Sequence, residues 1–203
     1  MLTAILDFGS VIPNSTERIS FSIAMPFVHL HTRSQYSILD GAMRPSEIVS
    51  RAQELDMKAV ALTDTCNLYG AVEFYKAAKS KGIHPVFGSE LWVWPEGVDQ
   101  FDDRTPDGGW NVVILIESPV GYQNLCALVT NAIFDGMHFR PRIDLAQLDA
   151  HKEGLIVLTG GILGPLGASC RDDLDTARDR ISQLHAILGD DHLFLELQDV
   201  GMP

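Results

Sequence analysis

The feature that most constrains the fold is a regular alternation between short apolar runs and longer stretches with helical spacing. Between the runs, apolar residues recur as Ile48, Val49, Ala52 and Leu55 do, one or two helical turns apart. The runs themselves are typical of strands covered on both faces. They occupy residues 27–31, 58–62, 85–93, 111–117, 155–161 and 192–198. Six strands separated by helices predict parallel crossovers and an α/β fold.

The length of the chain sets a limit on that fold. A closed βα barrel typically needs about 250 residues, and this chain has 203. We therefore expect a distorted, incomplete parallel (βα) barrel in which either the last predicted strand, residues 192–198, or the first, residues 27–31, carries an open edge. Residues 1–24 have weak periodicity, and Met25 opens a strongly patterned segment. We predict a leader over residues 1–24, with Met25 as the natural start, and one domain over residues 25–203.

The composition excludes several classes of protein. Apolar residues make up 46% of the chain and charged residues 21%, which is typical of a globular protein and not of a disordered one. The longest apolar runs, such as residues 112–116, have only five residues and are far shorter than a membrane helix. A net charge of −12 argues against a broad DNA-binding face. The three cysteines form no CxxC pair, which favours reduced thiols in a cytoplasmic protein.

Candidate functional residues follow the predicted strands, where side chains of βα folds gather into sites. His29 and His31 share one face of a strand, which is a common way to place two imidazoles on a metal; a hydrogen-bonded core histidine is the alternative. Asp64 is either a ligand or a cap of the loop that follows residues 58–62. Glu90 interrupts an apolar strand, where an unpaired carboxylate would be costly, so either it has a cationic or metal partner or Ser89 faces inward in its place.

Four motifs in fixed order resemble a known family. These are YSILDG, LTDTCNLYG, GSE and GYQNL, within a match that runs from Met25 to about Val200. They resemble the PHP (polymerase and histidinol phosphatase) domain at the N-terminus of bacterial DNA polymerase III alpha subunits. The resemblance implies a seven-stranded barrel of which this chain would hold six strands. It also implies a trinuclear metal site at the carboxyl ends of the strands.

The same resemblance indicates that the metal site is degenerate. His31 and Asp40 match two ligands of the first motif, and Glu90 matches a carboxylate that joins metals. Other ligand positions carry residues that do not match the family pattern: Arg33, Thr65, Asn111 and Gly161. Two carboxylates and one imidazole beside a cation do not make a competent zinc or manganese site. We expect no catalytic residue and no cofactor, with zinc or manganese bound only if the degenerate site still holds a metal.

The resemblance thus favours a noncatalytic structural and docking module of a replicative polymerase. Its partners would be the rest of the alpha subunit and the proofreading exonuclease subunit, with DNA reached only through the full polymerase. A metal-dependent phosphoesterase or 3′–5′ exonuclease is the alternative, so the enzymatic status stays open. Arg33 is a candidate replacement for the lost metal charge, because its guanidinium can pair with Asp40, Glu90 or both; the alternative is that Arg33 points to solvent.

Overall fold

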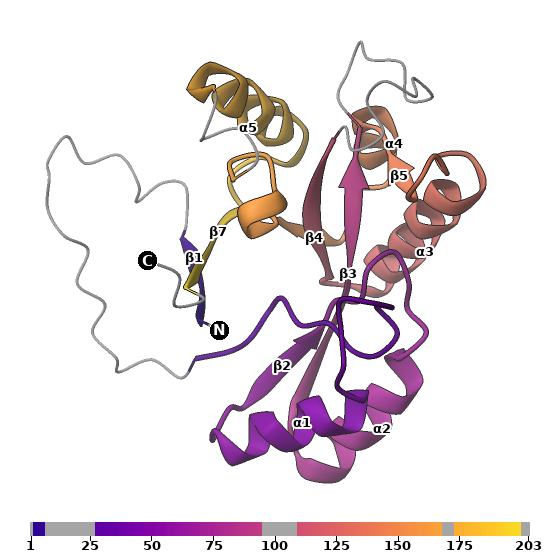
Figure 1. The fold of residues 1–203 in the computed structure, drawn as a ribbon, viewed down its shortest axis with the longest axis vertical. Helices are drawn as coiled ribbons and strands as arrows, with labels where there is room; N and C mark the ends of the chain where they lie inside the picture. Colours follow the sequence, from indigo (N-terminus) through magenta and orange to yellow (C-terminus); the bar gives the residue numbers. More distant parts are fainter. Residues whose placement is uncertain (1, 7–26, 95–108, 168–172, 200–203) are drawn as a thin grey trace, which may run out of the picture.

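The structure is a computed structural model that describes residues 2–6, 27–94, 109–167 and 173–199. Seven strands are present in this part of the chain: β1 (Leu2–Leu6), β2 (Ala59–Leu62), β3 (His84–Val93), β4 (Trp110–Ile116), β5 (Arg142–Ile143), β6 (Leu155–Leu158) and β7 (Leu193–Asp199). Five α-helices and a 3₁₀ turn accompany them: α1 (Pro45–Glu54), α2 (Ala71–Lys81), α3 (Pro119–Phe134), α4 (Leu145–Ala150), η2 (Gly161–Leu163) and α5 (Leu174–Leu188). The α/β class predicted from the sequence is confirmed (Figure 1).

Local signals in the sequence fix the ends of these helices. Ser118 precedes α3, and its hydroxyl accepts a hydrogen bond from the backbone N–H of Gly121, while Pro119 occupies the first turn. α2 ends at Gly82, whose φ of 67° lies in the left-handed region that a glycine adopts without strain. Asp173 caps α5 by accepting from two backbone N–H groups of its first turn.

The strands form one curled sheet in the order β1-β7-β6-β4-β3-β2, with β5 paired to β3. Two pairs that form part of the predicted parallel barrel, β2–β3 and β6–β7, are parallel. The expectation of an all-parallel sheet is wrong, because β4 runs antiparallel to both β3 and β6. A parallel connection needs a long crossover, usually a helix. The sequence between β3 and β4 carries no helical pattern, so the chain returns antiparallel.

The first predicted strand, residues 27–31, is not a strand in the structure. The segment still lies along β2, since the N–H of Ala61 bonds to the carbonyl of His29 and the N–H of Thr63 bonds to that of Thr32. The Thr63 hydroxyl accepts from the Thr32 N–H at 2.8 Å and donates to the Thr32 carbonyl at 3.1 Å. The Thr63 hydroxyl therefore bonds to the Thr32 N–H where a backbone carbonyl of β2 would otherwise do so, and the ladder between residues 27–31 and β2 is interrupted.

Of the two strands predicted to carry an open edge, the one over residues 192–198 is paired with β1 along its second half. β1 pairs antiparallel with β7 over five residues, from Leu2 opposite Asp199 to Leu6 opposite Leu195. β1 lies beside β7 in Figure 1, away from the helices that cover the rest of the sheet. On this side of β7, residues 195–199 are thereby paired.

β4 is buried on both faces and separates two apolar layers. On its outer face Val112 and Ile114 pack with Leu125 and Leu128 of α3. On its inner face, Val113 and Leu115 form a smaller cluster with Ala61 and Leu158. α1 and α2 cover β2 through a third cluster that includes Ile48, Phe74 and Val60. Within the described ranges, no helix is both long and apolar enough to cross a membrane.

Candidate functional site

The buried carboxylate of Asp64 holds the loop that follows residues 27–33. Asp64 is 1% exposed, and its Oδ1 accepts from the Ser34 N–H at 2.7 Å and from the Ser37 hydroxyl at 2.6 Å. Its Oδ2 accepts from the Ser34 hydroxyl at 2.8 Å. The sequence predicts that Asp64 is either a ligand or a cap of the loop after residues 58–62. In the structure its carboxylate caps another loop, the one after residues 27–33. This loop carries Asp40 and leads into α1.

The loop that follows β2 is joined to β3 next to Glu90. The Glu90 N–H donates to the Asp64 carbonyl at 3.1 Å, and the Cys66 N–H donates to the Glu90 carbonyl at 2.8 Å. Glu90 stands opposite Val113 in the β3–β4 register, and Val113 belongs to the inner apolar layer. Residues directly opposite in a ladder share a face. The Glu90 side chain therefore projects to the inner face of the sheet.

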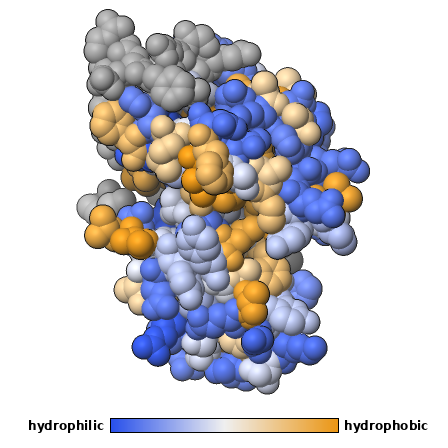
Figure 2. Space-filling model, turned by 90° about the vertical axis from the view of Figure 1, so that its right-hand side faces the viewer, coloured by the Kyte–Doolittle hydropathy of each residue, from blue (hydrophilic) through white to orange (hydrophobic). Residues whose placement is uncertain are grey.

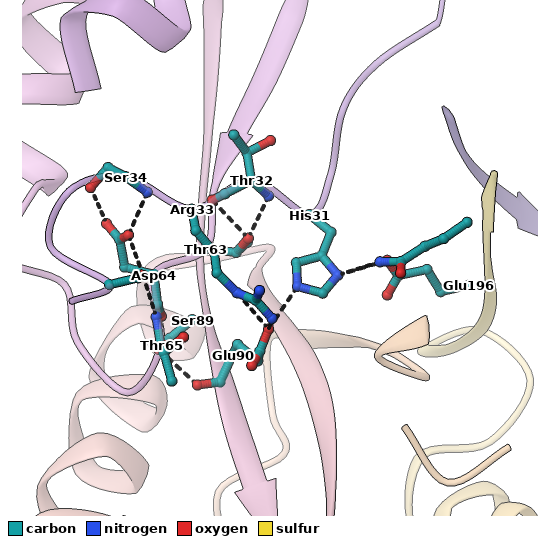
Figure 3. Close-up of polar contacts among 12 residues, drawn as sticks. His31, Thr32, Arg33, Ser34, Thr63, Asp64, Thr65, Ser89, Glu90 and Glu196 are labelled. Carbon is teal, nitrogen blue, oxygen red and sulfur yellow. Dashed lines mark hydrogen bonds and ion pairs between the residues drawn. The ribbon is translucent and has the colours of Figure 1, made fainter. Parts of the chain in front are cut away.

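Four charged side chains meet at this inner face (Figure 3). His31 lies between two carboxylates: its Nε2 is 2.7 Å from Glu90 Oε2, and its Nδ1 is 2.7 Å from Glu196 Oε1. Arg33 donates to the same Oε2 of Glu90 through Nε at 3.0 Å and also through Nη2. Because each of these charges has a partner of opposite sign, the cluster of His31, Arg33, Glu90 and Glu196 neutralises itself.

The carboxylates set the protonation of this cluster. Burial by itself lowers the pKa of His31, but the hydrogen bonds and charges of Glu196 and Glu90 outweigh burial and raise that pKa to about 9. Burial likewise raises the pKa of Glu90, while its bond to His31 and the charge of Arg33 bring a net lowering. His31 is therefore an imidazolium at neutral pH, and it donates from both ring nitrogens.

The other ligand positions of the resemblance do not join the cluster. Asp40 is exposed, and no ion pair joins it to another described residue. The Thr65 hydroxyl and both polar atoms of the Asn111 side chain are buried without a hydrogen-bond partner among the described residues. Gly161 has a φ of 64°, and a Cβ there would lie 2.4 Å from the Gln198 side-chain oxygen. A cysteine there would be strained by the positive φ and would have to displace the end of the Gln198 side chain.

Sequence reasoning missed Glu196. It is 4% exposed on β7, and its second oxygen, Oε2, has no partner within the described part of the chain. The signal was present, since Glu196 is a carboxylate inside an apolar strand, as Glu90 is. A pocket of about 890 Å³ opens over the cluster, with His31, Arg33 and Glu196 in its lining. Apolar side chains supply much of the remaining wall, among them Ile48, Leu55, Ile162, Leu163 and Leu166.

These residues do not fit the metal centre that the resemblance implies. Both nitrogens of His31 are engaged by carboxylates, so neither offers a lone pair to a metal. The guanidinium of Arg33 occupies Glu90 Oε2. Although His31, Glu90 and Glu196 meet here, no group of three or more His, Cys, Asp or Glu side chains in the described ranges has an arrangement able to hold a metal ion. The side chains of His31, Arg33, Glu90 and Glu196 instead form an internal cluster of paired charges.

Comparison with known proteins decides the family. The PHP domain model matches residues 29–200. The chain belongs to the PHP domain family. Its relatives include the DNA polymerase III alpha subunits of Treponema pallidum, 36% identical over 180 residues, and of Thermus aquaticus, 38% identical over 188 residues. Each alignment covers 88% of this chain and 15% of the relative. The chain thus spans about 15% of the length of these relatives.

A solved structure shows the same fold. It is a protein of Bifidobacterium adolescentis assigned as a metal-dependent phosphoesterase, with a TM-score of 0.53 and 14% sequence identity. The match covers 82% of this chain and 75% of that protein. The likeness supports the incomplete PHP-type barrel.

Proposed function

We propose that this chain is a noncatalytic structural and docking module, equivalent to the N-terminal PHP region of a replicative DNA polymerase of the polymerase III alpha type. The alpha-subunit relatives, 36–38% identical over most of the chain, support the polymerase context. The observation that carries the noncatalytic part is the ion cluster. His31 and Arg33 supply positive charge to Glu90 and Glu196 at the place where the family pattern expects metals.

The surface is consistent with docking. Figure 2 shows apolar residues gathered across the middle of one face of the molecule, with hydrophilic residues above and below. Among the large exposed apolar side chains, Phe134 at the end of α3 is 81% exposed and Phe139 in the next loop is 69% exposed. Exposed apolar patches of this kind mark interaction sites. The partners that we propose are the rest of the alpha subunit and the proofreading exonuclease subunit, with DNA reached through the assembled polymerase.

The catalytic part of the proposal is tested by assaying cleavage. The purified chain is incubated with a labelled single-stranded oligonucleotide and with bis(p-nitrophenyl) phosphate, in zinc, manganese or magnesium and in a chelator. We expect no metal-dependent turnover of either substrate. The proposal is contradicted by turnover that the chelator abolishes and that is clearly lower in a Glu90→Gln variant. Such turnover would assign a phosphoesterase or 3′–5′ exonuclease. Turnover that Glu90→Gln leaves unchanged belongs to a contaminant and leaves the expected result in place.

The docking part is tested separately. The chain is mixed with the proofreading exonuclease subunit of the same replicase and passed over a size-exclusion column. We expect the two proteins to elute together, and separate elution at micromolar concentrations would contradict this partner. Primer extension by the chain alone should give no template-dependent synthesis.

A further inference from the structure

β7 is divided between two neighbours. Its first two residues, Leu193 and Phe194, pair with Val157 and Leu158 of β6. From Leu195 onward β6 has ended, and the remaining residues of β7 pair with β1 alone in the register of the sheet. The two ladders therefore meet without overlap in the middle of the strand. The outer half of β7, residues 195–199, depends on β1 for its backbone ladder.

The outer half of β7 carries the side chains that reach the ion cluster. Glu196 Oε1 lies 2.7 Å from His31 Nδ1 and accepts from the Gln198 side-chain amide at 2.6 Å. On the β6 side, the Thr159 hydroxyl accepts from the Glu196 N–H at 2.9 Å. Extended backbone makes alternate side chains share a face. Glu196 and Gln198 share the inner face only while this half stays a strand.

We propose that β1 is a positioning strand, which holds residues 195–199 extended and so places the Glu196 carboxylate against His31. β1 lies outside the matched family segment, residues 29–200, and is joined to residue 27 by 20 intervening residues. Its pairing is strand addition to a sheet edge, in which main-chain hydrogen bonds supply the affinity. The outer half of β7 is therefore a strand-accepting edge, and its occupant is the chain's own Leu2–Leu6.

The alternation of an antiparallel ladder supplies a matched pair of variants. Neighbouring residues of β1 point their N–H groups in opposite directions, one toward β7 and one toward solvent. Thr3 and Ala4 are such neighbours, opposite Gln198 and Leu197. Proline removes the backbone N–H. At Ala4 this removes a hydrogen bond to β7, and at Thr3, whose N–H points to solvent, it removes none. Thr3→Pro and Ala4→Pro are made in the full chain.

Two readouts are followed in both variants: amide hydrogen exchange of residues 195–199, and the NMR signal of the His31 ring N–H that bonds to Glu196. The Glu196 N–H points to Thr159 on the β6 side, so the next residue, Leu197, bonds to its partner Ala4 in β1. We therefore expect Ala4→Pro to speed exchange of these amides about tenfold and to remove the slowly exchanging ring proton. The other proline should change exchange by less than about twofold. Unchanged exchange in α1 and β2 shows that the variants fold. Ala4→Gly, which keeps the N–H but weakens the strand, should give a smaller rise in the same amides.

Three results would overturn the proposal. The first is exchange at residues 195–199 that neither proline changes. The second is an equal effect of the two prolines, which would exclude the alternating ladder. The third is faster exchange with the His31 ring proton retained, which would show that β1 does not position Glu196. None of these results involves metal or cleavage, so they are distinct from the test of the noncatalytic function.

Discussion

Replacing Arg33 by alanine is the perturbation whose cost can be worked out from the structure. The Glu90 side chain is 3% exposed, and Arg33, at 27%, is partly reached by water. Breaking a fully buried ion pair costs about 3–5 kcal/mol. Here the cost is lower, because water screens the guanidinium and Glu90 keeps its bond to His31. Hydrogen bonds to charged groups contribute about 1.5–3 kcal/mol. We therefore expect Arg33→Ala to lower the free energy of unfolding by about that amount.

The assay is urea unfolding followed by far-UV circular dichroism, with and without chelator. The expected loss moves the unfolding midpoint by roughly 1 M urea. The chain supplies its own control: Arg51 pairs with Glu54 on α1, with both side chains 62% exposed, so Arg51→Ala should cost less than about 1 kcal/mol. An Arg33→Ala variant that unfolds at the wild-type midpoint, or that loses no more stability than Arg51→Ala, would show that the Arg33–Glu90 pair does not stabilise the fold.

Three further predictions concern the same site. The pKa of His31 is raised from 6.5 to about 9 in the fold, so its contribution, roughly 3 kcal/mol, is full below pH 6.5 and is lost as the pH rises through 9; urea midpoints at pH 6 and pH 9.5 should differ, and much less so in His31→Gln. Asp64→Ala leaves three donors unpaired and should cost about 3 kcal/mol, whereas Asp40→Ala, at an exposed position, should stay within about 0.5 kcal/mol. Arg33→His exchanges the blocking cation for an imidazole, and zinc should then raise the melting temperature of this variant but not that of the wild type.

Much of the fold was predictable because its signals are local. The helices α1, α2, α3 and α5 follow from apolar spacing, from Pro45 and Pro119 in first turns, and from the glycine at the end of α2. The need of Glu90 for a partner was predictable as well, because a buried unpaired charge is costly, whereas its inward orientation, with Ser89 as the alternative, came only from the β3–β4 register. These inferences need only neighbouring residues and one rule about burial.

The parts that were missed depend on distant residues. Thr63 interrupts the first strand through a side chain 31 positions away. Glu196 meets His31 across 165 positions, and only the curling of the sheet brings them together. The connection that precedes β4 carries no helical pattern in its sequence, and the alternation of apolar runs does not report strand direction. β1 was missed because its register with β7 joins the two ends of the chain.

The central claim is that internal cations have replaced metals in this PHP domain, and metal binding by the purified chain tests it most directly. The chain is stripped with chelator, equilibrated by dialysis against zinc or manganese, and its metal content is measured by mass spectrometry beside a Glu90→Gln variant. We expect that neither protein retains a stoichiometric amount of zinc or manganese. A stoichiometric amount of zinc or manganese on the wild type that is lost in Glu90→Gln would contradict it.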